Sequence, residues 1–154
     1  MLNKRLFEFL KKRTFLNVGT STLDGKPNNV SKLLLKAENN HIYLVDYSIG
    51  RTYSNLKLNP RVSLSFFDLD KLVGYQINGP VEIIEKGVEY DKIKSELTEK
   101  EISLATERII KGVSTGQSHE SFEFAPPRHF VIFKIKIEEI AEVGYSGEVK
   151  REKS

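Results

Sequence analysis

The chain of 154 residues contains no cysteine and no tryptophan. Without cysteine it has no disulfide, no thiolate metal ligand and no thiol nucleophile. Its histidines, His41, His119 and His129, are scattered and do not show the spacing of a metal-ligand motif. We therefore expect neither a bound metal nor a cysteine-based reaction.

Long apolar runs are also missing. No segment approaches the roughly 20 consecutive apolar residues of a membrane-spanning helix. The opening stretch, MLNKRLFEFLKKRTF, lacks the apolar region and the cleavage site of a signal peptide. Neither sign of charge dominates, because 24 basic residues stand against 21 acidic ones. The sequence therefore predicts a cytoplasmic protein that has neither a membrane nor a nucleic acid as its partner.

The common catalytic motifs are absent as well. The sequence holds no Gly-x-Ser-x-Gly, no His-Glu-x-x-His, no P-loop and no Gly-x-Gly-x-x-Gly. A hydrolase that works with protein groups alone is therefore poorly supported, and the sequence does not identify catalytic residues.

What the chain does contain is a succession of strand-like segments joined by short turns. Apolar and polar residues alternate in them, as in RVSLSFFD, and turn residues such as Asp24-Gly25 separate them. The expected strands are residues 15–21, 30–37, 41–46, 61–68, 72–85 and 129–143. Gly79-Pro80 is expected to mark a bulge or a bend in the fifth of them. The pattern predicts a small antiparallel β-barrel with helical decoration.

Helical periodicity marks two further regions, residues 2–12 and 88–111. In the second region, Thr98 and Glu101 form a capping box that is expected to begin a new helix, and Gly112 is expected to end it.

The remaining segments complete the predicted organisation. Residues 113–127 are expected to form a long loop, and the charged residues 146–154 a disordered tail. Because no linker or repeat is visible, residues 1–145 are predicted to form a single domain.

The segment YSIGRTYSNLKLNP, between two expected strands, holds the best candidate site. Gly50 permits a tight turn, and Arg51 and Thr52 fall in the first turn of a short helix that ends near Leu58. Amide N–H groups at a helix start carry partial positive charge, and a guanidinium and a hydroxyl add further donors. The pattern indicates a phosphate site. On spacing alone, the alternative stays open that Arg51 is a solvated surface residue and that Thr52 caps a turn.

The order of three stretches carries a resemblance: LNVGTSTLDGKP, then NNVSKLLLKAENNHIYLVDYSIGRTYSNLKLNPRVSLSF, then GYQINGPVEII. Over residues 14–86 the chain resembles the pyridoxamine-phosphate-oxidase-like family of FMN-binding split barrels, and residues 129–140 fit the end of such a barrel. The resemblance implies a mainly β, six- to seven-stranded antiparallel split β-barrel of the FMN-binding type. It also implies a homodimer with the flavin at the subunit interface, and a flavin-dependent oxidoreductase that uses a small-molecule substrate or electron donor.

The resemblance assigns the flavin phosphate to the turn at Gly50, Arg51 and Thr52. It implies that Asn55, one turn later, orients this segment, and that Gln76 is a partner of the flavin ring or the phosphate. Two alternatives stay open, namely that Asn55 is a helix-end or turn asparagine and that Gln76 is an exposed barrel glutamine.

The resemblance also places the strand NNVSKLLLK alongside the flavin. It implies that Ser31 and Lys32 donate to ring or phosphate oxygens and that the backbone of Leu33 meets the pyrimidine edge. On the next strand, Val45 and Asp46 are implied to contact the flavin through the backbone or near the ring, since a carboxylate beside a phosphate is unfavourable.

Other interpretations stay open. The same barrel binds haem or the deazaflavin F420 in some proteins, and the C-terminal half lacks the substrate pattern of true pyridoxamine phosphate oxidases. A non-enzymatic flavin-binding or flavin-storing module is another alternative. The last is a β-barrel that binds single-stranded nucleic acid, which the mixed charges of VSLSFFDLDK do not favour.

Overall fold

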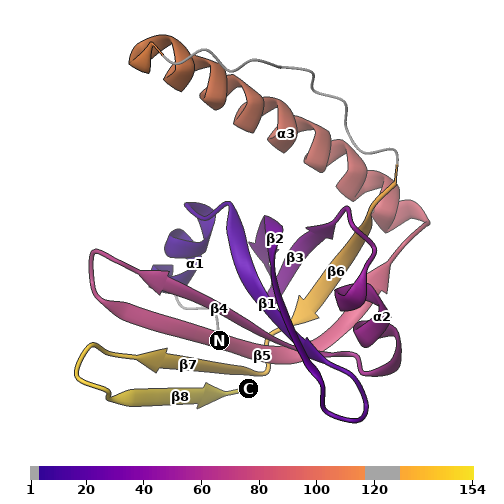
Figure 1. Ribbon diagram of the computed structural model, residues 1–154, viewed down its shortest axis with the longest axis vertical. Helices are drawn as coiled ribbons and strands as arrows, with labels where there is room; N and C mark the ends of the chain where they lie inside the picture. The colour runs from indigo at the N-terminus through magenta and orange to yellow at the C-terminus, as the bar shows by residue number, and fades with distance from the viewer. Residues whose placement is uncertain (1–3, 117–128) are drawn as a thin grey trace. The chain divides into compact units, whose positions relative to one another are not determined.

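The computed structural model describes residues 4–116 and 129–154 (Figure 1). In chain order the elements are α1 (Lys4–Lys11), β1 (Phe15–Ser21), β2 (Pro27–Glu38), β3 (His41–Asp46), α2 (Arg51–Leu58), β4 (Arg61–Asp68), β5 (Val73–Ile84), α3 (Val88–Thr115), β6 (Val131–Lys136), β7 (Glu139–Val143) and β8 (Val149–Lys153). The chain forms two compact units, one of Met1–Ile84 with Phe130–Ser154 and one of Glu85–His129.

The first unit is a closed barrel of antiparallel strands in the order β4-β1-β2-β3-β6-β5, and pairing of β4 with β5 closes it. β7 and β8 extend the sheet from β5 beyond the barrel. In Figure 1 these two yellow strands run side by side, next to β5. The prediction of a mainly β protein with an antiparallel split barrel is confirmed.

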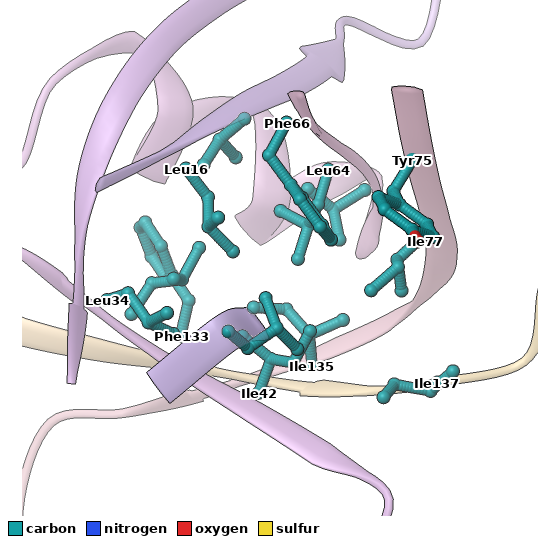
Figure 2. Close-up of a cluster of buried hydrophobic side chains, with 14 of the residues drawn as sticks. Leu16, Leu34, Ile42, Leu64, Phe66, Tyr75, Ile77, Phe133, Ile135 and Ile137 are labelled. Carbon is teal, nitrogen blue, oxygen red and sulfur yellow. The ribbon is translucent and has the colours of Figure 1, made fainter. Parts of the chain in front are cut away.

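Apolar side chains fill the barrel interior and alternate along each strand with residues that face outward. Figure 2 shows part of this core, where Leu64, Ile77 and Phe133 are completely buried. α1 confirms the amphipathic helix expected near the start of the chain, and its Leu6 and Leu10 belong to the same core.

β5 changes one of its neighbours at Gly79 and Pro80. On one edge it pairs with β4 through both residues, while on the other it pairs with β7 as far as Asn78 and with β6 from Val81. The chain that leaves β6 passes so close to Gly79 that a Cβ atom there would overlap the carbonyl oxygen of Lys136. The Gly-Pro pair therefore marks a change of partner within one continuous strand, and glycine is required by the close approach of another backbone.

The last residues form β8, where the charge pattern led us to expect a disordered tail. Glu139 on β7 accepts a hydrogen bond from Arg151 at 3.0 Å and lies 3.7 Å from the ammonium of Lys153. Asn78 donates to the same carboxylate, and this hydrogen bond, together with the two cations, lowers the pKa of Glu139. An edge strand pairs through its backbone and tolerates charged side chains, so hydrophobic alternation does not reveal it. The single domain over residues 1–145 stays a prediction.

The described part of the second unit is dominated by one long helix, α3. The expected start of a new helix at Thr98 is wrong, because α3 runs without a break from Val88 to Thr115. Inside this helix, Oγ1 of Thr98 donates to the carbonyl oxygen of Lys94 one turn earlier, at 3.0 Å. A threonine hydroxyl satisfied in this way fits inside a helix and does not begin one. The helix also runs through Gly112 and ends before Gly116, whose φ of 67° is left-handed.

Residues 117–127 of the predicted loop lie outside the described residues. Among the helices that the structure describes, none combines the length and the apolar composition that crossing a membrane requires.

Candidate functional site

The predicted phosphate turn lies between the end of β3 and the start of α2. Gly50 is the residue that precedes the helix, its φ is −105°, and no side chain caps the helix start. Its carbonyl oxygen accepts the amide of Ser54 at 3.0 Å, so the helix begins directly at Arg51, which is exposed. A helix start without a side-chain cap presents amide donors and partial positive charge, and an adjacent exposed guanidinium adds a full charge. The arrangement suits an anion.

The next two predicted residues of α2 point toward the β1–β2 hairpin. Thr52 is buried, and its Oγ1 accepts a hydrogen bond from Asn28 at 3.2 Å. Asn55 is also buried and donates to the hydroxyl of Thr20 at 3.0 Å. These bonds fix the helix to the hairpin and thereby hold the turn that carries Arg51. Direct contact of Thr52 or Asn55 with a ligand stays a prediction.

Lys32 and Asp46 meet in a buried ion pair. The ammonium of Lys32 lies 2.6 Å from Oδ1 of Asp46, whose side chain is fully buried. Ser48 joins the pair: Lys32 donates to its hydroxyl at 2.9 Å, and that hydroxyl donates to Asp46 at 2.8 Å. Sequence reasoning missed Ser48. The available signal was the Asp-x-Ser spacing, since aspartate commonly accepts the backbone N–H two residues further on, here at 3.1 Å.

Leu33 and Val45 are direct neighbours in the register of β2 and β3. Ile132 and Ile84 continue the same row across β6 and β5, and all four residues are buried. Because Leu34 belongs to the barrel core, alternation places this row on the outer side of the sheet. Where β2 and β3 pair, the structure thus brings Leu33 to Val45 on the outer side and Lys32 to Asp46 on the opposite side.

Ser31 and Gln76 belong to a different row. The strand registers place Ser31, Asn17, Ser65 and Gln76 successively across β2, β1, β4 and β5. Ser31 donates to the side chain of Asn17 at 2.9 Å, and Gln76 donates to the hydroxyl of Ser63 at 2.9 Å. Successive residues of a strand face opposite sides of the sheet, so the side chain of Ser31 points away from the Lys32–Asp46 pair.

A groove of about 1020 Å³ lies on the first unit. Its lining includes Asn28 and Ser63 at the barrel strands, and Asn78 and Lys136 near the change of partner in β5. Asn28 also donates to Thr52, so the groove reaches the hairpin that anchors α2. None of the residues predicted to bind the flavin lines this groove.

Comparison with known proteins agrees with this architecture. A family model described as pyridoxamine 5'-phosphate oxidase matches residues 2–144. No match to a curated protein was found. Among solved structures, HupZ of Group A Streptococcus is 18% identical with a TM-score of 0.66, over 96% of this chain and 98% of HupZ.

Three further solved structures differ in the ligand that their names state. An FMN-binding protein of Nostoc punctiforme is 12% identical with a TM-score of 0.55, over 92% of this chain and 87% of that one. An F420 reductase is 18% identical with a TM-score of 0.56, over 87% of this chain and 94% of the reductase. A haem-binding protein of Mycobacterium smegmatis is 13% identical with a TM-score of 0.61, over 93% of this chain and 54% of that protein. At such low identity the likeness shows the fold alone.

Proposed function

The chain belongs to the pyridoxamine 5'-phosphate oxidase family, and from this premise we propose that it binds FMN and acts as a flavin-dependent oxidoreductase. The observation that carries the proposal is the start of α2, where Gly50 leaves the helix without a side-chain cap and Arg51 is exposed. A phosphate group suits such a turn because its oxygens accept from helix-start amides and from a guanidinium together.

The charges near this turn support binding of an anion. Asp46 ends the strand that leads to the turn, and an uncompensated carboxylate there would repel a phosphate. Its oxygen lies 2.6 Å from the ammonium of Lys32, so the pair carries no net charge. Arg51 then supplies the positive charge, and its planar guanidinium offers parallel donors that match two phosphate oxygens.

Flavin, when bound, supplies the redox chemistry. In this proposal the protein holds the flavin phosphate at Arg51 and places β2 and β3 alongside the flavin ring. In this proposal Leu33 and Val45 give the ring an apolar, water-poor environment, while Ser31 and Gln76 supply polar contacts from the neighbouring row. The registers of β2, β3, β1, β4 and β5 support these two groupings.

We further propose that the protein is a cytoplasmic homodimer with the flavin enclosed between its subunits. Arg51 is exposed on one copy, so a ligand held there stays open to water unless a second subunit covers it. A small-molecule substrate or electron donor would reach the ring from the open side, and neither nucleic acid nor a membrane is expected as a partner.

The first experiment is a visible absorption spectrum of the concentrated, purified protein. A yellow protein that releases FMN on heating, identified by mass spectrometry, is the expected result. A colourless protein that takes up none of FMN, F420 and haem would contradict the proposal. FMN that stays bound but is neither reduced nor reoxidised by any donor or acceptor tried would indicate a flavin-binding module instead of an enzyme.

Replacing Arg51 with alanine is expected to weaken FMN binding by roughly 10- to 100-fold, as removal of a hydrogen bond to a charged group costs about 1.5–3 kcal/mol. Because Arg51 is exposed, the free energy of unfolding should change by less than about 0.5 kcal/mol. Fluorescence titration of the flavin-free protein measures the affinity.

Lys57→Ala is the matched control for this substitution. Lys57 is an exposed cation in the last turn of the same helix, so its loss removes equal charge at the opposite end from the proposed site. Equal weakening of FMN binding by the two substitutions would point to a general effect of charge and against a phosphate site at Arg51.

A second candidate cofactor is F420, which the similarity to an F420 reductase favours. Release of F420 from the purified protein, or uptake of F420 in preference to FMN, would replace the cofactor in the proposal and leave the family assignment intact. The haem-binding neighbour makes haem the third molecule to test in the same way.

A further inference from the structure

We propose that Ser48 is a positioning residue, which acts with Asp46 and Lys32 to hold the turn that carries Arg51. The ligand in this proposal is FMN, so its binding consequence rests on the proposed function. Lys32 and Asp46 would then serve the site through the turn and not by touching the flavin, which differs from their role in the family resemblance.

The hydrogen bonds around Ser48 form a closed set. Oδ1 of Asp46 accepts from the ammonium of Lys32 at 2.6 Å, from the hydroxyl of Ser48 at 2.8 Å and from the amide of Ser48 at 3.1 Å. The Ser48 hydroxyl in turn accepts from Lys32 at 2.9 Å. A serine hydroxyl has one proton to donate and lone pairs to accept, so both of its bonds are made at once. The set ties β2, the end of β3 and the following turn together.

The turn needs such a restraint because its next residue is in an unusual conformation. Ile49 has a φ of 46°, in the left-handed region that a β-branched residue rarely adopts. Such backbone persists only when its surroundings determine it. On one side Ser48 is fixed to Asp46, and on the other Gly50 accepts the first hydrogen bond of α2. The side chain of Ile49 packs against the core between them.

The direction in which Arg51 leaves the turn therefore depends on the bonds of Ser48. Removing the hydroxyl breaks two of those bonds and changes no charge, so a change in FMN affinity cannot arise from electrostatic attraction. Neutralising the carboxylate of Asp46 distinguishes a direct effect of its charge from a positioning role. If the negative charge acted directly on the FMN phosphate, removing it would strengthen FMN binding, whereas loss of the charge-assisted bonds to Ser48 would weaken FMN binding.

The test is Ser48→Ala, with Ser48→Thr as the conservative variant and Ser54→Ala as the control. Loss of about one net hydrogen bond should lower the melting temperature by about 2–4 °C in a domain of this size, so the variant stays folded. The alanine variant should bind FMN roughly 5- to 10-fold more weakly, the equivalent of about one net hydrogen bond. The threonine variant should restore the affinity to within a factor of about 2, the upper bound for a conservative surface change, and Ser54→Ala should match the wild type.

A second readout needs no ligand. Amide hydrogen exchange across residues 47–52 of flavin-free protein should be roughly fivefold faster in Ser48→Ala, as opening of this turn becomes easier by about 1 kcal/mol. Asp46→Asn, if it folds, should also weaken FMN binding, and tighter binding would overturn the positioning role. Unchanged exchange in Ser48→Ala overturns the proposal whether or not FMN is the ligand. A wild-type protein that binds no FMN refutes the proposed function, while the exchange result still decides the role of Ser48.

Discussion

Replacing Gly79 with alanine is expected to lower the free energy of unfolding of the barrel by roughly 3 kcal/mol, the upper part of the usual range for overpacking. A Cβ atom at this position would overlap the carbonyl oxygen of Lys136. That oxygen belongs to the backbone, so it cannot swing aside as the end of a long side chain can. Urea unfolding followed by circular dichroism would measure the change.

The backbone around Gly79 has little freedom to relieve this overlap. The amide of Glu138 donates to the carbonyl oxygen of Asn78 at 3.0 Å, on the residue before the glycine. Two residues after it, the amide of Val81 donates to Pro60 at 2.9 Å. Moving either chain far enough to admit a methyl group would lengthen one of these backbone bonds and weaken it.

Gly74→Ala, on the same strand, is the matched control. A Cβ atom there would lie 3.6 Å from Cδ2 of Phe67 and 3.9 Å from Val143, which are ordinary contacts. Its stability should therefore change by less than about 1 kcal/mol, and a small gain is expected because alanine is favoured over glycine within a strand. Equal stability of the two variants would show that the chain leaving β6 does not pass over Gly79 as closely as described.

The strands of the barrel were predictable because burial on one face leaves a trace in the sequence. β4, with Val62, Leu64 and Phe66 inside, alternates clearly between apolar and polar residues. β8 has no such trace, since all its side chains are exposed and its pairing is made by the backbone. Gly79-Pro80 marks an irregular position in the sequence but does not reveal the change of partner there, because that change depends on how the strands that follow in the chain return to the sheet.

The start of α2 was predictable because a turn and a helix start are local features, and α2 begins at Arg51 after Gly50, as the sequence predicts. Binding of a ligand by these two residues stays a prediction. The pairing of Lys32 with Asp46 depends on the register of β2 and β3, which a bulge between Leu34 and Lys36 shifts. No spacing along the chain reports such a register. The resemblance implied that both residues contact the flavin, and the structure adds that they contact each other.

Replacing Lys32 with methionine is expected to lower the free energy of unfolding by about 3–5 kcal/mol, the usual cost of leaving one member of a buried ion pair without its partner. The carboxylate of Asp46 is fully buried, and its Oδ2 has no hydrogen-bond partner in the described residues. Among the residues that the structure describes, the hydrogen bonds from Ser48 would then be the remaining ones to this buried carboxylate. Urea unfolding of the single variants Lys32→Met and Asp46→Asn and of the double variant would measure the coupling between the two positions.

The double variant separates the cost of an unpaired charge from the cost of altered packing. Lys32→Met with Asp46→Asn leaves no charge, and the amide oxygen can still accept from Ser48, so the double variant should be more stable than Lys32→Met alone by about 2 kcal/mol. An exposed pair is the control: Lys11→Met breaks the 3.2 Å contact with Glu8 and should cost at most about 1 kcal/mol. If the effects of Lys32→Met and Asp46→Asn simply added, the two side chains would act independently. The ion pair would then not hold β2 to the end of β3, and the turn before Arg51 would need another anchor.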